Sequence, residues 1–168
     1  MKSLLSDEKY SFISQCDKDF IIAFDTKMES CGYSTGGVIT PGYAGAPAWG
    51  RYLLIYAKVG VKSKQIAARI YCRDDGIILR LFLNNIDKHS AFIENAPEHI
   101  RAVFGNGHGD CNHCENKPGG MCKFRKHYTL SGQQHTKCSG EVFQFFKPDI
   151  TKLADYMGLF NEFYPVRK

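Results

Sequence analysis

The sequence predicts an α+β protein with an antiparallel sheet in the middle and helices at both ends. Apolar residues recur at helical spacing near the N-terminus, alternate with polar residues between 51 and 83, and again follow helical spacing after Pro148. A chain of 168 residues has the length of one domain. We therefore expect a single domain, 1–168, with residues 105–147 forming a cysteine-rich zinc-binding loop and hairpin integrated into it.

The N-terminal segment is predicted to be helical. Ser6, with two acidic residues after it, is typical of a helix start. Apolar residues then recur at helical spacing from Tyr10 to Cys31, and Gly32 is a natural stop. The Asp-Lys-Asp run at 17–19 could divide this segment into two helices.

Three antiparallel strands are predicted next, at residues 51–59, 65–72 and 77–83. The tetrapeptide 73–76 contains an Asp-Gly pair, which is a strong hairpin signal. Alternation places one set of side chains toward the N-terminal helix and the others, Arg80 among them, on a face that we expect to be solvated. The core-facing set is Cys72, Ile77, Leu79, Leu81 and Leu83.

The second half of the chain alternates short helices and strands. Helices are predicted at 86–94 and 97–104, strands at 125–130 and 142–146, and a last helix from 148 onward. Ser131-Gly132 is predicted to turn the chain after the 125–130 strand. The glycine-rich run 105–109 leads from a helix into the cysteine segment, so it does not have the strand-to-helix context of a phosphate-binding loop.

Four of the seven cysteines, Cys111, Cys114, Cys122 and Cys138, lie within 28 residues of one another. Thiolates bind Zn²⁺ in a tetrahedral arrangement, and a Cys-x₂-Cys turn supplies two of them from one loop. A hairpin centred on Ser131-Gly132 would bring the other two to the same end. The spacing therefore predicts a structural four-cysteine Zn²⁺ site.

Two other interpretations of the segment stay open. His108, His113, His127 or His135 could replace one cysteine, which would fit a metal-dependent enzyme with an open coordination position. An iron–sulfur cluster would also use cysteine ligands. A thioredoxin-type redox motif is disfavoured, because a Pro-Gly-Gly run follows Cys114 closely and leaves no room for a long helix.

Positive charge gathers near the cysteines. The chain has a net charge of +5, and in residues 101–168 ten Lys and Arg residues face six Asp and Glu residues. One interpretation is a nucleic-acid surface formed by Lys123, Arg125, Lys126 and Tyr128. The other is that Lys117, Lys137 and several of these same residues offset the negative charge of a zinc–thiolate centre.

Aromatic residues suggest a second candidate site. Tyr33, Trp49, Tyr52 and Tyr56 lie in or beside a glycine-rich segment, where aromatic side chains can line a ligand pocket. They can equally cover the edge of the core.

Taken together, the sequence favours a zinc-binding protein that acts as a ligand-binding or regulatory module rather than an enzyme. Its partner would be a small molecule or a protein, with nucleic acid as the alternative. No apolar run approaches the about 20 residues that cross a bilayer, and the N-terminus lacks the apolar core of a signal peptide. We therefore expect a cytoplasmic protein that does not bind membranes, with free or metal-bound thiols.

Overall fold

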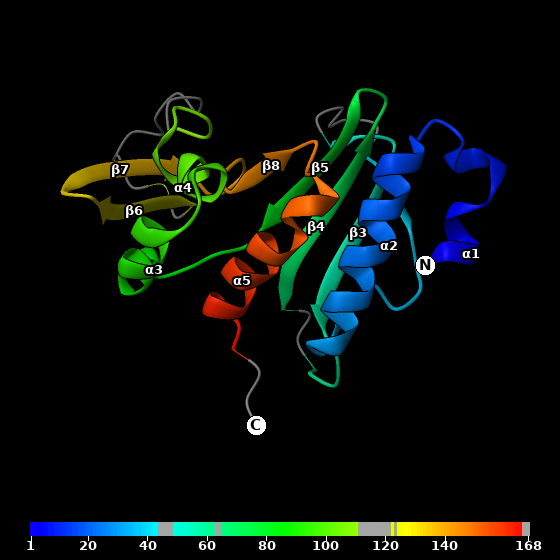
Figure 1. Ribbon diagram of the computed structural model, residues 1–168, viewed down its shortest axis with the longest axis horizontal. Helices are drawn as coiled ribbons and strands as arrows, with labels where there is room; N and C mark the ends of the chain where they lie inside the picture. Colours follow the sequence, from blue (N-terminus) through cyan, green and yellow to red (C-terminus); the bar gives the residue numbers. More distant parts are fainter. Residues whose placement is uncertain (44–48, 63–64, 111–121, 123, 166–168) are drawn as a thin grey trace.

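The computed structural model describes residues 1–43, 49–62, 65–110, 122 and 124–165. Its architecture is α+β, with helices at both ends and antiparallel pairing between all the strands described (Figure 1). The predicted fold class is confirmed at this level.

The main sheet has six strands in the order β1-β3-β4-β5-β8, with β2 also paired to β3. These strands are β1 (Tyr33–Ser34), β2 (Thr40–Pro41), β3 (Tyr52–Lys58), β4 (Ile66–Arg73), β5 (Gly76–Leu81) and β8 (Gln144–Phe146). A separate two-stranded sheet consists of β6 (Arg125–Leu130) and β7 (Gln133–Cys138). The β4–β5 turn differs slightly from the prediction: Arg73 pairs with Gly76, so Asp74 and Asp75 are its central residues rather than the Asp-Gly pair.

The helical segments are α1 (Lys2–Leu5), η1 (Glu8–Tyr10), α2 (Gln15–Ser30), η3 (Ile86–His89), α3 (Ser90–Asn95), α4 (Glu98–Gly105), η4 (Ile150–Lys152) and α5 (Leu153–Phe163). The predicted helix start at Ser6 is wrong. Ser14 caps the long helix instead, because its hydroxyl accepts the amide N–H of Asp17 at 3.1 Å. The hydroxyl of Ser6 donates to the carbonyl of Ser3, which closes the short first helix.

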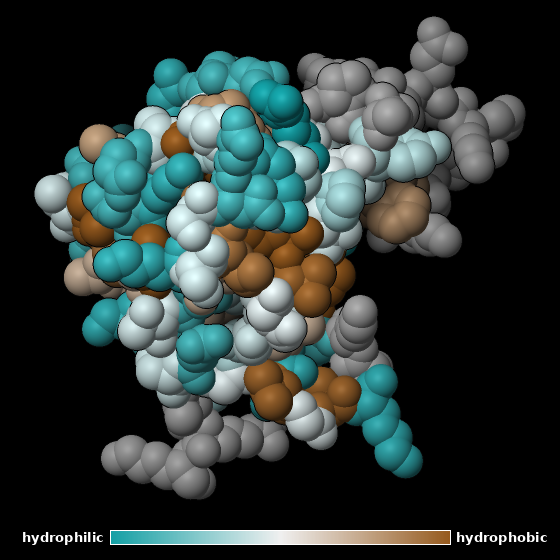
Figure 2. Space-filling view, turned by 90° about the vertical axis from the view of Figure 1, so that its right-hand side faces the viewer, coloured by the Kyte–Doolittle hydropathy of each residue, from teal (hydrophilic) through white to brown (hydrophobic). Residues whose placement is uncertain are grey.

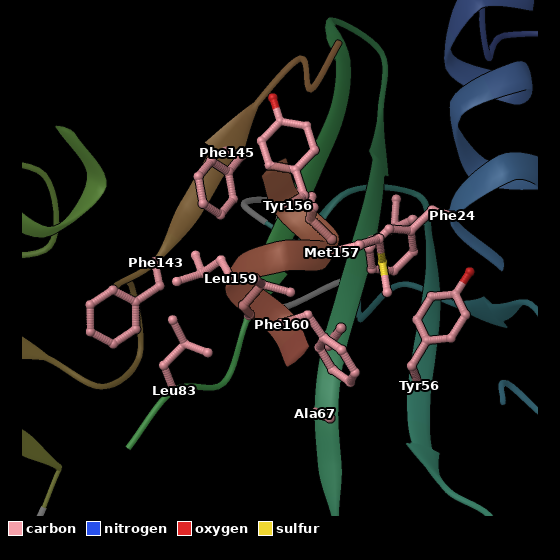
Figure 3. Packing of buried hydrophobic residues seen from close by; sticks show 14 of the residues in the cluster. Phe24, Tyr56, Ala67, Leu83, Phe143, Phe145, Tyr156, Met157, Leu159 and Phe160 are labelled. Carbon is pink, nitrogen blue, oxygen red and sulfur yellow. The ribbon is translucent and has the colours of Figure 1, made fainter. Parts of the chain in front are cut away.

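Helices α2 and α5 cover one face of the main sheet, and the hydrophobic core lies between these two layers (Figure 1). Phe24 of α2 and Tyr56 of β3 meet edge to face at 5.3 Å between ring centroids. From α5, Met157 and Phe160 point toward the strands (Figure 3). Each large apolar side chain buried in this way contributes roughly 1.5–3 kcal/mol to folding. The predicted core-facing set from Cys72 to Leu83 is buried here, as expected.

The opposite face of the sheet is not simply solvated, which corrects the expectation from sequence. Leu53, Tyr71 and Ile78 lie in one cross-strand row and are nearly inaccessible to solvent. Arg80 is also buried, because it donates hydrogen bonds to the Tyr71 hydroxyl and to the carbonyl of Ser139. The chain just after β7 therefore contacts this face of the sheet.

The β6–β7 hairpin lies to one side of the main sheet, next to α3 and α4 (Figure 1). Several polar contacts attach it there. The Lys126 ammonium donates to the carbonyl of Leu83 at 2.9 Å, and the Tyr128 hydroxyl donates to the carbonyl of Phe104 at 2.6 Å. The Glu94 carboxylate accepts the Ser131 amide at 2.6 Å. The hairpin is thus held along its whole length.

The side of the molecule that carries α1 is mostly hydrophilic, with a hydrophobic patch at the centre right of the view (Figure 2). Exposed large hydrophobic side chains include Val59 and Val61, just after β3. In the described part of the chain, no helix has the length and apolarity needed to cross a membrane.

Candidate metal centre

The β6–β7 hairpin has the turn that the sequence predicts. Leu130 pairs with Gln133 and Arg125 pairs with Cys138, so Ser131 and Gly132 are the two turn residues. Their φ angles are +50° and +75°, the left-handed values of a type I′ turn. This register puts Cys138 at the open end of the hairpin, and Cys122 lies just before the first strand.

Cys122 and Cys138 each begin a tight turn. The carbonyl of Cys122 accepts the amide of Arg125, and the carbonyl of Cys138 accepts the amide of Glu141, both at 3.0 Å. The two turns are joined, because the Ser139 amide donates to the carbonyl of Phe124 at 2.8 Å. A ligand cysteine at the start of such a turn is the arrangement that lets short loops present thiolates to a metal.

The Sγ of Cys138 lies over the backbone of its own turn. It is 3.5 Å from the position that a Cβ of residue 140 would occupy, so Gly140 leaves the space around the sulfur open. Cys122 and Cys138 are both half-buried and both free thiols. Each therefore combines partial access with a backbone fixed by hydrogen bonds.

Cys111 and Cys114 lie outside the described residues, but the chain leading to them is placed. Asp110 forms an antiparallel bridge with Lys137, and the Cys138 amide donates to the carbonyl of Gly109 at 2.7 Å. The residue before Cys111 thus pairs with the residue before Cys138. Within the described ranges alone, no three His, Cys, Asp or Glu side chains form a group that could hold a metal.

The histidines of this region have other neighbours. His127 and His135 lie in the body of the hairpin, where His127 is 3.1 Å from the Thr136 hydroxyl and His135 stacks on Tyr128. His135 is three residues from Cys138 on one strand, so their side chains point to opposite faces. The ring of His108 packs edge to face on Phe146. His113 is outside the described residues.

The basic residues near the cysteines are largely used inside the protein. The Lys126 ammonium also donates to Asn84 Oδ1 at 2.6 Å, and burial, followed by repulsion from Arg80, lowers its pKa. Tyr128 is buried, and this burial raises the pKa of its hydroxyl. Arg125 is half-buried, and Lys123 lies outside the described residues. The Lys126 ammonium and the Tyr128 hydroxyl are thus both engaged in hydrogen bonds to backbone carbonyls.

Lys137, which the sequence suggests as a counter-charge for thiolates, faces the other way. Its ammonium is buried against the 106–110 segment, where it pairs with Asp110. Neighbouring residues of a strand point to opposite faces, so Lys137 is directed away from the side of Cys138. Its role is to hold the chain that enters the cysteine segment.

The four aromatic residues of the candidate ligand pocket do not share one location. Tyr33 and Tyr56 are buried in the core, where Tyr33 packs on Phe160. Tyr52 packs against Tyr10 of the N-terminal segment, with ring centroids 4.8 Å apart. Trp49 is 40% exposed and lies near Arg69. Of the four, Trp49 is the one on the outer surface of the sheet.

A groove between α4 and the hairpin was not foreseen from sequence. It has a volume of about 420 Å³, within the range of small-ligand sites. Its lining residues include Glu98, Arg101, Asn106, Ser131, Gln133 and His135. The first and last of these residues, Glu98 and His135, are 37 positions apart in the sequence. They come together only because the hairpin packs against α4.

No protein-family model matches the chain, and neither the curated proteins nor the solved structures include a significant match to it.

Proposed function

We propose that this protein is a zinc-binding, non-enzymatic ligand-binding module, in which Cys111, Cys114, Cys122 and Cys138 hold one structural Zn²⁺. The observation that supports this most directly is the pairing at the open end of the hairpin. There, the turns of Cys122 and Cys138 are hydrogen-bonded to each other, and Gly109–Asp110 pairs beside Cys138. The turns of Cys122 and Cys138 and the two residues that lead into Cys111 thus meet at one end of the hairpin.

A four-thiolate set favours a structural role over a catalytic one. Structural zinc sites are closed by four protein ligands, whereas catalytic sites keep a position for water or substrate. Zinc also needs no surrounding secondary structure, since ligand bonds replace the hydrogen bonds of an irregular loop. The metal would therefore fix the long 105–124 connection, which carries few apolar residues of its own.

The function of such a site would be to support, through the hairpin, the groove that lies toward its turn. Ser131, Gln133 and His135 of the hairpin form one wall of this groove, and Glu98 and Arg101 of α4 form another. A metal at the open end of the hairpin would hold β6 and β7 in register, and with them the groove wall. The mixed charge of these residues suits a small polar ligand.

The metal content of the purified protein tests the proposal. We expect about one zinc per chain by elemental analysis, and four thiols that become reactive only after chelation. Changing Cys111, Cys114, Cys122 or Cys138 to Ser should each lower the zinc content strongly. Cys16→Ser is the matched control, since Cys16 is exposed at the start of α2 and should leave zinc unchanged. Equal zinc content in all five variants would refute the assigned ligands.

Replacement of zinc by Co²⁺ separates the four-cysteine site from an open site with one histidine. Four thiolates should give the intense absorption of tetrahedral thiolate-bound Co²⁺, and His108→Ala, His127→Ala and His135→Ala should leave it unaltered. A spectrum that changes in one of these histidine variants would favour the metal-dependent enzyme instead.

A further inference from the structure

Two arginines lie side by side on the outer face of the main sheet, away from α2 and α5. Arg69 of β4 pairs directly with Arg80 of β5. Side chains directly opposite each other in an antiparallel pair are close neighbours, and like charges in such positions repel. The pair therefore needs a compensating interaction.

Aromatic rings surround both guanidinium groups. The Cζ atoms of Arg69 and Arg80 lie 5.2 and 4.5 Å from the centroid of the same ring, that of Phe82. Arg69 also lies 5.8 Å from the ring of Trp49, and Arg80 donates to the Tyr71 hydroxyl at 3.1 Å. Packing on rings holds the two charged planes in fixed positions.

No carboxylate among the described residues pairs with either arginine. The Nε–H groups of both are buried and make no hydrogen bond within the described part of the protein. Other arginines of the sheet behave differently, since Arg51 pairs with Asp74 and Arg73 with Asp75. The five residues before Trp49 in the sequence, Ala-Gly-Ala-Pro-Ala, include no acidic residue either.

A third cation, Lys126, adds to the positive electrostatic potential around the two arginines. Lys126 is close enough to Arg80 for its pKa to be lowered by that charge, after the larger effect of burial. Arg80 itself is 4% exposed, so little water screens it. Arg69 is half-buried, so its side chain is partly accessible to solvent, next to the exposed Trp49.

We propose that Arg69 and Arg80 form a binding site for an anionic oxygen group, a phosphate or a carboxylate, on a small ligand. Guanidinium groups recognise both of these groups through paired N–H donors. The bound anion would accept from Arg69 at the surface and would offset the repulsion between the two arginines. Trp49 would form the exposed edge of the site. This inference does not require the proposed zinc, although Arg80 donates to the carbonyl of Ser139, next to Cys138.

Trp49 makes the test direct, because it is the only tryptophan of the chain. The protein is titrated with inorganic phosphate in one series and with citrate in another, at constant ionic strength set with sodium chloride. We expect a saturable change in tryptophan fluorescence in at least one series, and the series that gives it identifies the anion. Arg69→Gln should weaken the binding about tenfold or more, as expected for loss of a charge-assisted pair of hydrogen bonds.

Arg73→Gln is the matched control. Arg73 is on the same strand but pairs with Asp75, so its variant should bind both anions as the original protein does. Arg69→Lys serves as a second variant in case Arg69→Gln lowers the unfolding temperature. Fluorescence that does not saturate with either anion, or that responds equally in Arg69→Gln, would overturn the proposal. So would a loss of bound zinc in Arg69→Gln without any anion effect, because the arginines would then only balance the metal centre.

Discussion

Lys137 places its ammonium group 2.5 Å from the Asp110 carboxylate, on the inner side of the hairpin. The lysine side chain is 1% exposed, whereas that of Asp110 is 51% exposed. The same ammonium also donates to the carbonyls of Asn106 and His108. One buried ammonium group thus donates to three acceptors of the 106–110 segment, which leads into the cysteines. These bonds hold that segment against β7.

Lys137→Met should therefore lower the free energy of unfolding by about 1–3 kcal/mol, since it removes the donor that the carbonyls of Asn106 and His108 share. Asp110→Asn should cost less than about 1 kcal/mol, because that carboxylate is half exposed. Urea denaturation of both variants provides the comparison. A Lys137→Met cost no larger than that of Asp110→Asn would show that the carbonyls do not depend on the lysine.

Asp25 of α2 gives a pH dependence with a defined sign. Burial raises the pKa of its carboxyl group, repulsion from Glu29 adds to this, and the α-amino group of Met1 at 3.9 Å opposes it. A group with a raised folded pKa contributes stability below its unfolded value, about 3.8, and loses it as the pH rises through the folded value.

Asp25→Asn should consequently be more stable than the original protein at pH 7, and the advantage should shrink toward pH 4. Denaturant unfolding at these two pH values measures it. Asp19→Asn, an exposed position on the same helix, provides the control for the loss of one negative charge. An advantage of Asp25→Asn that does not change with pH would contradict the assigned cause.

Cys72 should be the least reactive thiol outside the metal site. Burial raises its pKa to about 12, with a smaller effect from Asp17, so it remains a thiol at pH 8. Cys16 is exposed. We expect iodoacetamide to modify Cys16 at least about a hundred times faster than Cys72 in the native protein, as judged by peptide mass spectrometry. Comparable rates would mean that β4 opens readily, and unfolding in urea should make the two rates equal.

Local patterns in the sequence predicted the three central strands and the β6–β7 hairpin, but not the short strands β1 and β2. For the hairpin, the reason lies in the residues of its turn. Ser131-Gly132 occupies two left-handed positions, and Gly132 is suited to one of them. The register of the hairpin follows from that turn and places Cys138 opposite Arg125. In β5, the alternation of apolar and polar residues likewise correctly placed Leu79 and Arg80 on opposite faces of the sheet.

Contacts between distant segments could not be predicted from the same patterns. Alternation puts Arg69 and Arg80 on one face, but only the register shows that they are directly opposed. The burial of Arg80 depends on the carbonyl of Ser139, 59 residues away. The groove beside α4 depends on the Glu94–Ser131 contact in the same way. Such pairings are set by tertiary packing, for which a single sequence carries no local signal.

Gly50 and Gly60 offer a matched pair for a last prediction about how Trp49 is positioned. Both have left-handed φ angles, +73° and +78°. A Cβ at Gly60 would meet no atom within 4 Å, whereas one at Gly50 would lie 2.4 Å from the carbonyl oxygen of Cys72. The backbone at Gly50 is thus pressed against the end of β4, directly beside Trp49.

Gly60→Ala should cost about 1 kcal/mol, the strain of a left-handed alanine. Gly50→Ala should cost about 3 kcal/mol or more, because backbone atoms must also move apart to relieve the clash. The tryptophan emission of Gly50→Ala should shift as well, because a displaced backbone at residue 50 should move Trp49 away from Arg69. Gly60→Ala should leave the emission unchanged. Thermal unfolding and emission spectra of the two variants check both points. Equal costs and equal spectra would show that the close approach at Gly50 does not hold Trp49 in place.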